Sequence, residues 1–364
     1  MRFFPRSILS ALALVLLASL IPGAQSQAQT VYVNRCTAGS GDGSPSNPYN
    51  TLTRAVDLAP PGSTLVVQGG SYPERLTIGQ LSNQKNLTIT AQRGPALIGG
   101  YFVGIQENIC VPVTRREGTP FDPNSPANCA GNPPGARAKL YYPAAAPGDA
   151  PVACGGPFPL IVYAHARRFI DYPLCDWSQP GPPVDQDYRQ LDGILTRLAA
   201  AGIIVVSVDV SWSGDALTER SFMVDALAYA RDENARPGSR LQGAVNLVRV
   251  GLMGHSTGGE AAIRAAACLN GRCPPELRLA DVRVSAVALL APGFEADDPH
   301  ESLDVMGMNA PVLIIYGTKD TQQVHDDPLK VYGMAGRPKH LVIVTGANHY
   351  GYTDGICIGG GGGG

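Results

Sequence analysis

The sequence predicts an α/β protein with a doubly wound, mostly parallel sheet, preceded by a small β-rich segment. From about Tyr101 onward, short apolar runs alternate with stretches of helical spacing. That alternation is typical of a parallel sheet covered by helices on both faces. Residues 30–101 instead hold short strand candidates separated by turns. We therefore expect a β-rich segment over 30–101 and an α/β domain over 105–357.

The β-rich segment opens with a short strand at 31–33, a polar, glycine-rich stretch and a helix at 51–58. Further strand candidates follow at 64–68, 75–78, 86–90 and 96–98. The resemblance of this segment to other proteins is carried by YVNRCTAGSGDGSPSNPYNTLTRAVDLAPPGSTLVVQGGSYPE. It resembles the N-terminal cap and first rungs of secreted right-handed parallel β-helices of the pectate-lyase-like group. No repeat continues after Gly100, so the segment is interpreted as a truncated module that either binds polysaccharide or is a passive appendage.

The α/β domain is expected to contain eight strands and three main helices. The first two, at 111–115 and 136–142, are joined by a long loop rich in Pro, Asn and Gly. Apolar runs predict the other six: 159–165, 203–209, 248–253, 284–290, 312–316 and 341–344. Helical spacing is found at 185–201, at 220–232 and in the alanine-rich stretch after Ser256. Because these strands alternate with helices, their carboxyl ends are expected to meet at one edge of the sheet.

The stretch 248–262, VRVGLMGHSTGGEAA, carries the strongest chemical signal. A strand-like run leads into Gly254-His255-Ser256-Thr257-Gly258 and then into a helical pattern, which is the G-x-S-x-G arrangement of a nucleophile elbow. The small flanking residues allow strand and helix to pack closely, while the turn exposes the Ser256 hydroxyl. The alternative is an ordinary strand-to-helix turn in which Ser256 caps the helix.

Polar residues that follow other strands supply partners for Ser256. Asp320 follows the strand at 312–316, and His349 follows the strand at 341–344. Nucleophile, acid and base thus occur in the order Ser256, Asp320, His349, as in α/β-hydrolases. Serine is a weak nucleophile that needs a base, and the base needs an acid to orient it. The alternatives for acid and base are Asp297, Asp298, His300 and His325.

Four motifs in this order resemble the α/β-hydrolase superfamily: PLIVYAHAR, VGLMGHSTGGEAA, APVLIIYGTKD and VIVTGANHYG. They are similar to its secreted lipase, cutinase/polyester-hydrolase and platelet-activating-factor-acetylhydrolase-like branches. The resemblance implies an oxyanion hole formed by the backbone N–H of Thr257 and by a second N–H in the loop after the strand at 159–165. Here Ala166 replaces the usual glycine, which leaves the second donor open between Ala166 and Arg167. Aromatic residues in loops at the same edge either line a substrate pocket or pack under the loops: Phe169, Tyr172, Trp177 and Trp212.

The N-terminus predicts an export signal over residues 1–28. Arg2 and Arg6 give a positive start, 8–21 an apolar core, and small residues a cleavage site. The apolar run is short for a membrane span, so we expect no stable membrane anchor. Without this leader the chain carries roughly 26 basic and 30 acidic residues, and no basic block that would bind nucleic acid.

The eight cysteines fit an oxidising compartment and lack the paired C-x-x-C spacing of a zinc site. Their spacing offers three local pairs: Cys110/Cys129, Cys154/Cys175 and Cys268/Cys273. We expect a secreted or periplasmic protein and a disordered glycine tail at 358–364. The residues favour a serine hydrolase that cleaves carboxylic esters and needs neither a metal nor an organic cofactor. The esters expected are those of lipids, of polyesters or of acyl groups linked to polysaccharide. A catalytically silent glycan-binding protein, or a peptidase or acyltransferase with the same triad, are the alternatives.

Overall fold

The computed structural model describes residues 27–76, 85–113, 128–129, 135–166, 189, 191–210, 216–272, 274–293, 299–321 and 327–352. The chain divides between Gly99 and Gly100 into two compact units, which are described separately. Residues 1–26 of the expected leader and the glycine tail at 358–364 lie outside the described residues.

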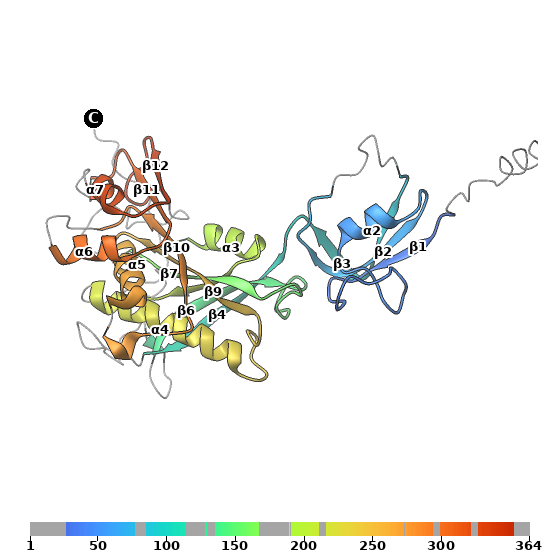
Figure 1. Ribbon diagram of the computed structural model, residues 1–364, viewed down its shortest axis with the longest axis horizontal. Helices are drawn as coiled ribbons and strands as arrows, with labels where there is room; N and C mark the ends of the chain where they lie inside the picture. Colours follow the sequence, from blue (N-terminus) through green and yellow to red (C-terminus); the bar gives the residue numbers. More distant parts are fainter. Residues whose placement is uncertain are drawn as a thin grey trace, which may run out of the picture. The chain divides into compact units, whose positions relative to one another are not determined.

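The first unit is a three-stranded parallel sheet with one helix (Figure 1). Its elements are β1 (Thr30–Val33), α2 (Leu52–Leu58), β2 (Thr64–Tyr72) and β3 (Thr88–Ile98). The strands are in register, since Thr30 pairs with Thr64 and Thr64 with Thr88. Helix α2 begins after Thr51, whose side chain accepts a hydrogen bond from the Arg54 N–H at 3.2 Å, as expected of a helix cap. Alternate residues of β1 and β2, with the apolar face of α2, form a small core of their own.

Two strand predictions in this unit were wrong. Residues 75–76 form no strand, and 77–78 lie outside the described residues. The candidates 86–90 and 96–98 belong to one strand, β3, rather than two. The intervening Arg93-Gly94-Pro95 has the composition of a turn, but the pairing of β3 with β2 shifts register there. Arg93 and Gly94 adopt positive φ angles of 60° and 121°, so the chain forms a bulge inside the strand.

The second unit contains a nine-stranded sheet within the described residues. Its strand order is β12-β11-β10-β9-β7-β8-β6-β4, and β5 pairs with β6. The strands from β12 to β8 run parallel, whereas β4, β5 and β6 pair antiparallel. The strands are β4 (Phe102–Pro112), β5 (Asn128–Cys129), β6 (Gly135–Ala144), β7 (Phe158–Ala164), β8 (Ile204–Val208), β9 (Val245–His255), β10 (Val284–Leu290), β11 (Val312–Gly317) and β12 (Lys339–Val344).

Helices cover both faces of this sheet (Figure 1). Leu160 and Val162 of β7 join one core cluster with residues of α4 and α5, while Tyr163 joins a second cluster with Leu195 of α3. The predicted mixed α/β architecture with a mostly parallel sheet is therefore confirmed. The helices are α3 (Asp192–Ala200), α4 (Ala216–Ala235), α5 (Thr257–Ala267), α6 (Pro299–Gly307) and α7 (Asp327–Met334), and short turns lie at Cys268–Arg272 and Pro275–Leu277.

Element boundaries differ from the prediction where exposed polar residues interrupt the apolar pattern. The strand expected at 111–115 is the end of β4, which begins at Phe102. Its middle, including Glu107 and Asn108, is exposed, and the pairing with β6 shifts register there. Helix α3 covers 192–200 of the expected 185–201, and residues 185–188 and 190 lie outside the described residues. Helix α4 extends beyond the expected 220–232 at both ends.

Cys110 and Cys129 form a disulfide, which confirms that predicted pair. Cys36, Cys154 and Cys268 are also disulfide-bonded, and no cysteine in the described ranges is free. Cys175 and Cys273 lie outside these ranges. None of the helices in the part of the chain that the structure describes has both the length and the apolar character of a membrane span.

Candidate functional site

The carboxyl ends of the parallel strands bring the predicted site residues to one edge of the sheet. Ala164 at the end of β7 pairs with Gly254 of β9, and Leu290 at the end of β10 pairs with His255. Gly317 at the end of β11 pairs with Val344 at the end of β12. The residues that follow these strands therefore start from a common edge, where open α/β sheets bind their ligands.

Ser256 occupies the turn between β9 and α5 in a strained backbone conformation. Its φ and ψ angles are 55° and −121°, outside the regions that L-residues with a side chain favour. Such strain costs about 1–3 kcal/mol and is concentrated at functional sites. Ser256 stands at the N-cap position, but its side chain makes no capping hydrogen bond. The Ser256 side chain therefore does not cap α5, contrary to the alternative of a capping serine.

Two glycines allow the turn to be this sharp. A Cβ on Gly254 would lie 1.9 Å from the carbonyl oxygen of Gly258, so strand and helix approach too closely for any side chain. A Cβ on Gly258 would lie 2.3 Å from the carbonyl oxygen of Ala164. The first glycine thus fits β9 against α5, and the second fits α5 against the end of β7.

Backbone hydrogen bonds hold the strained residue in place. The Ser256 N–H donates to the Leu290 carbonyl at 3.0 Å, and the Ser256 carbonyl accepts from the Gly293 N–H at 2.8 Å. The same carbonyl accepts from the N–H groups of Gly259 and Glu260 in the first turn of α5. The end of β10 and the start of α5 therefore fix Ser256 from both sides.

His349 and Asp320 form a buried pair, as the sequence predicts. Nδ1 of His349 lies 2.8 Å from Oδ2 of Asp320, and each side chain is 3% exposed. A carboxylate beside Nδ1 keeps the proton on that nitrogen and leaves Nε2 as the proton acceptor. Within the described residues, the loops after β12 and β11 thus bring an imidazole and a carboxylate into direct contact.

His255 connects this pair to the turn that carries Ser256. Its Nε2–H donates to the backbone carbonyl of His349 at 2.8 Å, and the two imidazole rings are 5.0 Å apart. His255 is completely buried, and burial, with the nearby His349 as a second cause, lowers its pKa to about 3. Ser256, the next residue along the chain, is 4% exposed and lies at the same edge.

The loop after β7, where the second oxyanion donor is predicted, is fixed by a buried histidine. His165 accepts a hydrogen bond from the Val210 N–H through Nε2 at 2.9 Å, and its Nδ1 lies 2.7 Å from the Ala166 carbonyl oxygen. Oδ1 of Asp209 is 3.2 Å from the same Nε2. Ala166 is therefore tied to the loop after β8. Arg167, the alternative donor, lies outside the described residues.

Thr257, the other predicted oxyanion donor, is the first residue of α5. N–H groups in a first helical turn point toward the positive end of the helix, where negative charge is stabilised. Asp297, Asp298 and His325 lie outside the described residues, and His300 falls in the first turn of α6. The predicted pocket residues also lie outside them: Phe169, Tyr172, Trp177 and Trp212.

Sequence reasoning did not assign roles to His165, Asp209, His255 and Gly293. A weak signal existed for the histidines, since each is a polar residue at the end of an apolar strand. Nothing in the sequence indicates that His255 contacts a residue 94 positions away. Gly293 carries no local signal, because its role depends on the pairing of β10 with β9.

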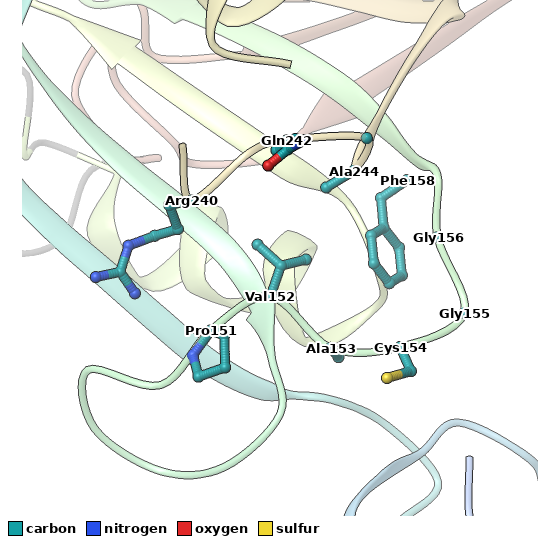
Figure 2. Close-up of a pocket in the computed structure, with 11 residues that line it drawn as sticks. Pro151, Val152, Ala153, Cys154, Gly155, Gly156, Phe158, Arg240, Gln242 and Ala244 are labelled. Carbon is teal, nitrogen blue, oxygen red and sulfur yellow. The ribbon is translucent and has the colours of Figure 1, made fainter. Parts of the chain in front are cut away.

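A separate pocket of about 270 Å³ lies at the opposite edge of the sheet (Figure 2). Its walls come from the segments that precede β7 and β9, including Val152 and Gln242, and from Phe158, the first residue of β7. Arg240 at its rim is paired with Asp149 at 2.7 Å and donates to the Ala150 carbonyl, so its charge is compensated locally. No group of three His, Cys, Asp or Glu side chains among the described residues is arranged to hold a metal ion.

No model of a known protein family matches the chain, and no curated protein matches it.

Proposed function

We propose that the chain is a serine hydrolase of the α/β-hydrolase type that cleaves carboxylic esters through an acyl-enzyme. The observation that carries the proposal is the position of the His349–Asp320 pair beside a strained serine turn. Ser256 has a φ of 55°, and the preceding His255 binds the backbone of His349 directly. Strained backbone at a serine, a buried His–Asp pair and a common strand edge together support nucleophilic catalysis by Ser256.

In the proposed mechanism, Ser256 Oγ attacks the ester carbonyl carbon while Nε2 of His349 takes the hydroxyl proton. Asp320 holds the imidazole in the Nδ1–H tautomer and stabilises its protonated form. The tetrahedral intermediate collapses, the C–O bond breaks, and His349 returns the proton to the departing alcohol. Water then attacks the acyl-enzyme with His349 again acting as the base, which releases the acid and restores Ser256.

The negative oxygen of the intermediate requires backbone donors that are already in position. The proposed donors are the Thr257 N–H at the start of α5 and the N–H of either Ala166 or Arg167. The His165 contacts to Ala166 and Val210 support a fixed position for this loop. Fixed donors stabilise developing charge without the reorganisation that water would need.

We further propose that the first unit is the start of a right-handed parallel β-helix. Its support is the in-register parallel ladder of β1, β2 and β3. The disulfides support a secreted or periplasmic location, and we propose that residues 1–28 are an export signal. A polysaccharide-linked ester is one proposed substrate class, with lipid and polyester esters as the others. If removing the first unit leaves binding to acetylated xylan unchanged, the proposal that this unit directs the protein to polysaccharide-linked esters is contradicted.

The test is hydrolysis of short-chain p-nitrophenyl esters by the wild-type protein and by Ser256→Ala. We expect activity in the first and a loss of about 10⁴-fold or more in the second, since removing the nucleophile disables the triad as a unit. Labelling by a fluorophosphonate should occur on Ser256 and disappear in the variant. Equal activity of the two proteins, or an inert wild type, would contradict the proposal and favour a catalytically silent binding protein. Turnover of amides in place of esters would indicate a peptidase, and transfer to an added alcohol an acyltransferase.

A further inference from the structure

In the proposed mechanism, His349 takes the proton of Ser256, so its loop must extend from the end of β12 to the end of β9. In the strand order, β10 and β11 separate β12 from β9. Neighbouring strands lie about 4.8 Å apart, so the ends of β9 and β12 are separated by about 14 Å. The loop after β12 therefore has to fold over the ends of two strands. Its position determines whether the imidazole meets the serine.

Contacts to β11 hold the middle of this loop. The Lys319 N–H donates to the Ala347 carbonyl at 2.9 Å, and the Gly346 N–H donates to the Thr318 hydroxyl at 2.9 Å. Gly317 makes this approach possible, because a Cβ there would lie 2.1 Å from the Ala347 carbonyl oxygen. These contacts fix the loop against the strand that carries Asp320. They do not by themselves fix it against the strand that carries Ser256.

One contact that reaches β9 is the hydrogen bond from His255 to the backbone of His349. A carbonyl oxygen only accepts, so Nε2 of His255 carries the hydrogen and donates it over 2.8 Å. The ring of Tyr350 stands edge-on to both imidazoles, with centroids 5.8 Å from His255 and 5.1 Å from His349. His349 and His255, the residue before Ser256, are thus joined both by a buried hydrogen bond and by ring packing.

We propose that His255 is a positioning residue that fixes His349 relative to Ser256 through its hydrogen bond to the His349 carbonyl. The inference rests on the proposed function. Errors of about 1 Å in the placement of a reacting group cost about 100-fold in rate, so one hydrogen bond at this point controls turnover. Asp320 sets the tautomer and rotation of the imidazole, whereas His255 sets the backbone from which it projects.

The protonation state of His255 suits this role. With Nε2–H donated to a carbonyl, Nδ1 carries a lone pair, and this buried atom has no hydrogen-bond partner within the described residues. Burial, assisted by the neighbouring His349, keeps the imidazole neutral. His255 therefore remains a donor while His349 gains and loses a proton in the proposed mechanism.

The test compares His255→Leu, His255→Gln and His255→Asn with wild type, using hydrolysis of p-nitrophenyl acetate. A glutamine amide nitrogen reaches the place of Nε2, whereas an asparagine amide stops near the place of Nδ1. We expect His255→Leu and His255→Asn to lose about 10- to 100-fold in kcat with KM within about two-fold, and His255→Gln to stay within about three-fold of wild type. His340→Leu, on an exposed histidine of β12, is the matched control and should be unaffected.

Equal activity of the glutamine and asparagine variants would overturn the inference even if His255→Leu did not fold. Activity of His255→Leu within about two-fold of wild type would overturn it as well. Amide hydrogen exchange over residues 345–352 gives a readout that does not need turnover. It should accelerate at least about ten-fold in His255→Asn and not in His255→Gln. An inert wild type would refute the proposed function, whereas unchanged exchange in His255→Asn would refute the positioning role alone.

Discussion

Nδ1 of His349 and Oδ2 of Asp320 are 2.8 Å apart and buried, although 29 positions of sequence separate the two residues. In the proposed mechanism, a buried carboxylate in this contact stabilises the charged imidazole that forms when His349 takes up the serine proton. The pair joins the ends of two neighbouring strands, so its geometry follows from the parallel pairing of β11 and β12.

Replacing Asp320 by asparagine should lower kcat by about 10³- to 10⁴-fold with a small change in KM. The amide keeps the size of the side chain but removes the charge and favours the wrong tautomer of His349. Ester hydrolysis at saturating substrate measures the effect. Asp297→Asn and Asp298→Asn are the controls, since the sequence left both as alternative acids. A larger loss in either of them would move the role of the acid away from Asp320.

Replacing Gly258 by alanine should destabilise the protein by about 2–4 kcal/mol. The new Cβ would stand 2.3 Å from the Ala164 carbonyl oxygen, so α5 must move away from β7. Urea unfolding measures the change in the free energy of unfolding. Gly333→Ala is the matched control, because no atom lies within 4 Å of a Cβ there and alanine favours the helix. Equal stabilities of the two variants would show that the elbow tolerates a side chain.

The architecture could be predicted because apolar strand patterns and the G-x-S-x-G spacing are local signals. The order Ser256, Asp320, His349 follows from placing polar residues after successive strands of a parallel sheet. The predicted strand boundaries were wrong where the local composition was that of a turn or of an exposed polar stretch. Arg93-Gly94-Pro95 forms a bulge within β3, where the sequence predicts a break between two strands. The polar middle of β4 lies inside one long strand, of which the sequence predicts only the end. In both cases pairing with a neighbouring strand overrides the local preference.

The contacts that support the site could not be predicted, because they depend on which strands become neighbours. His255 and His165 are read from the sequence only as polar residues at strand ends. Their partners, the His349 carbonyl and the Val210 N–H, are backbone groups of distant loops. Backbone groups carry no residue-specific signal, so a single sequence does not reveal such contacts.

Replacing His165 by phenylalanine should lower both stability and activity. The ring would keep its volume, but the Val210 N–H would lose this acceptor and the Ala166 carbonyl its contact with Nδ1. We expect a loss of about 1–3 kcal/mol in the free energy of unfolding. Because the loop presents a proposed oxyanion donor, kcat should fall about ten-fold or more. His340→Phe, at an exposed position of β12, should change neither quantity. A stability loss without any loss of kcat would separate His165 from the oxyanion loop.

The free energy of unfolding should fall as the pH is lowered below about 6.5, and His255 should account for part of that fall. Burial lowers its pKa from 6.5 to about 3 in the folded chain. Between these values the unfolded chain binds a proton that the folded chain does not, so acidification favours unfolding by about 1.4 kcal/mol per pH unit. In His255→Gln this dependence should be shallower by that amount, as measured by urea unfolding at about pH 6, 5 and 4 with the disulfides intact. His340→Gln, which removes a histidine from an exposed position of β12, is the matched control. If His255→Gln and wild type had equal slopes, His255 would have to bind a proton in the folded state, and its Nδ1 would then need a buried acceptor.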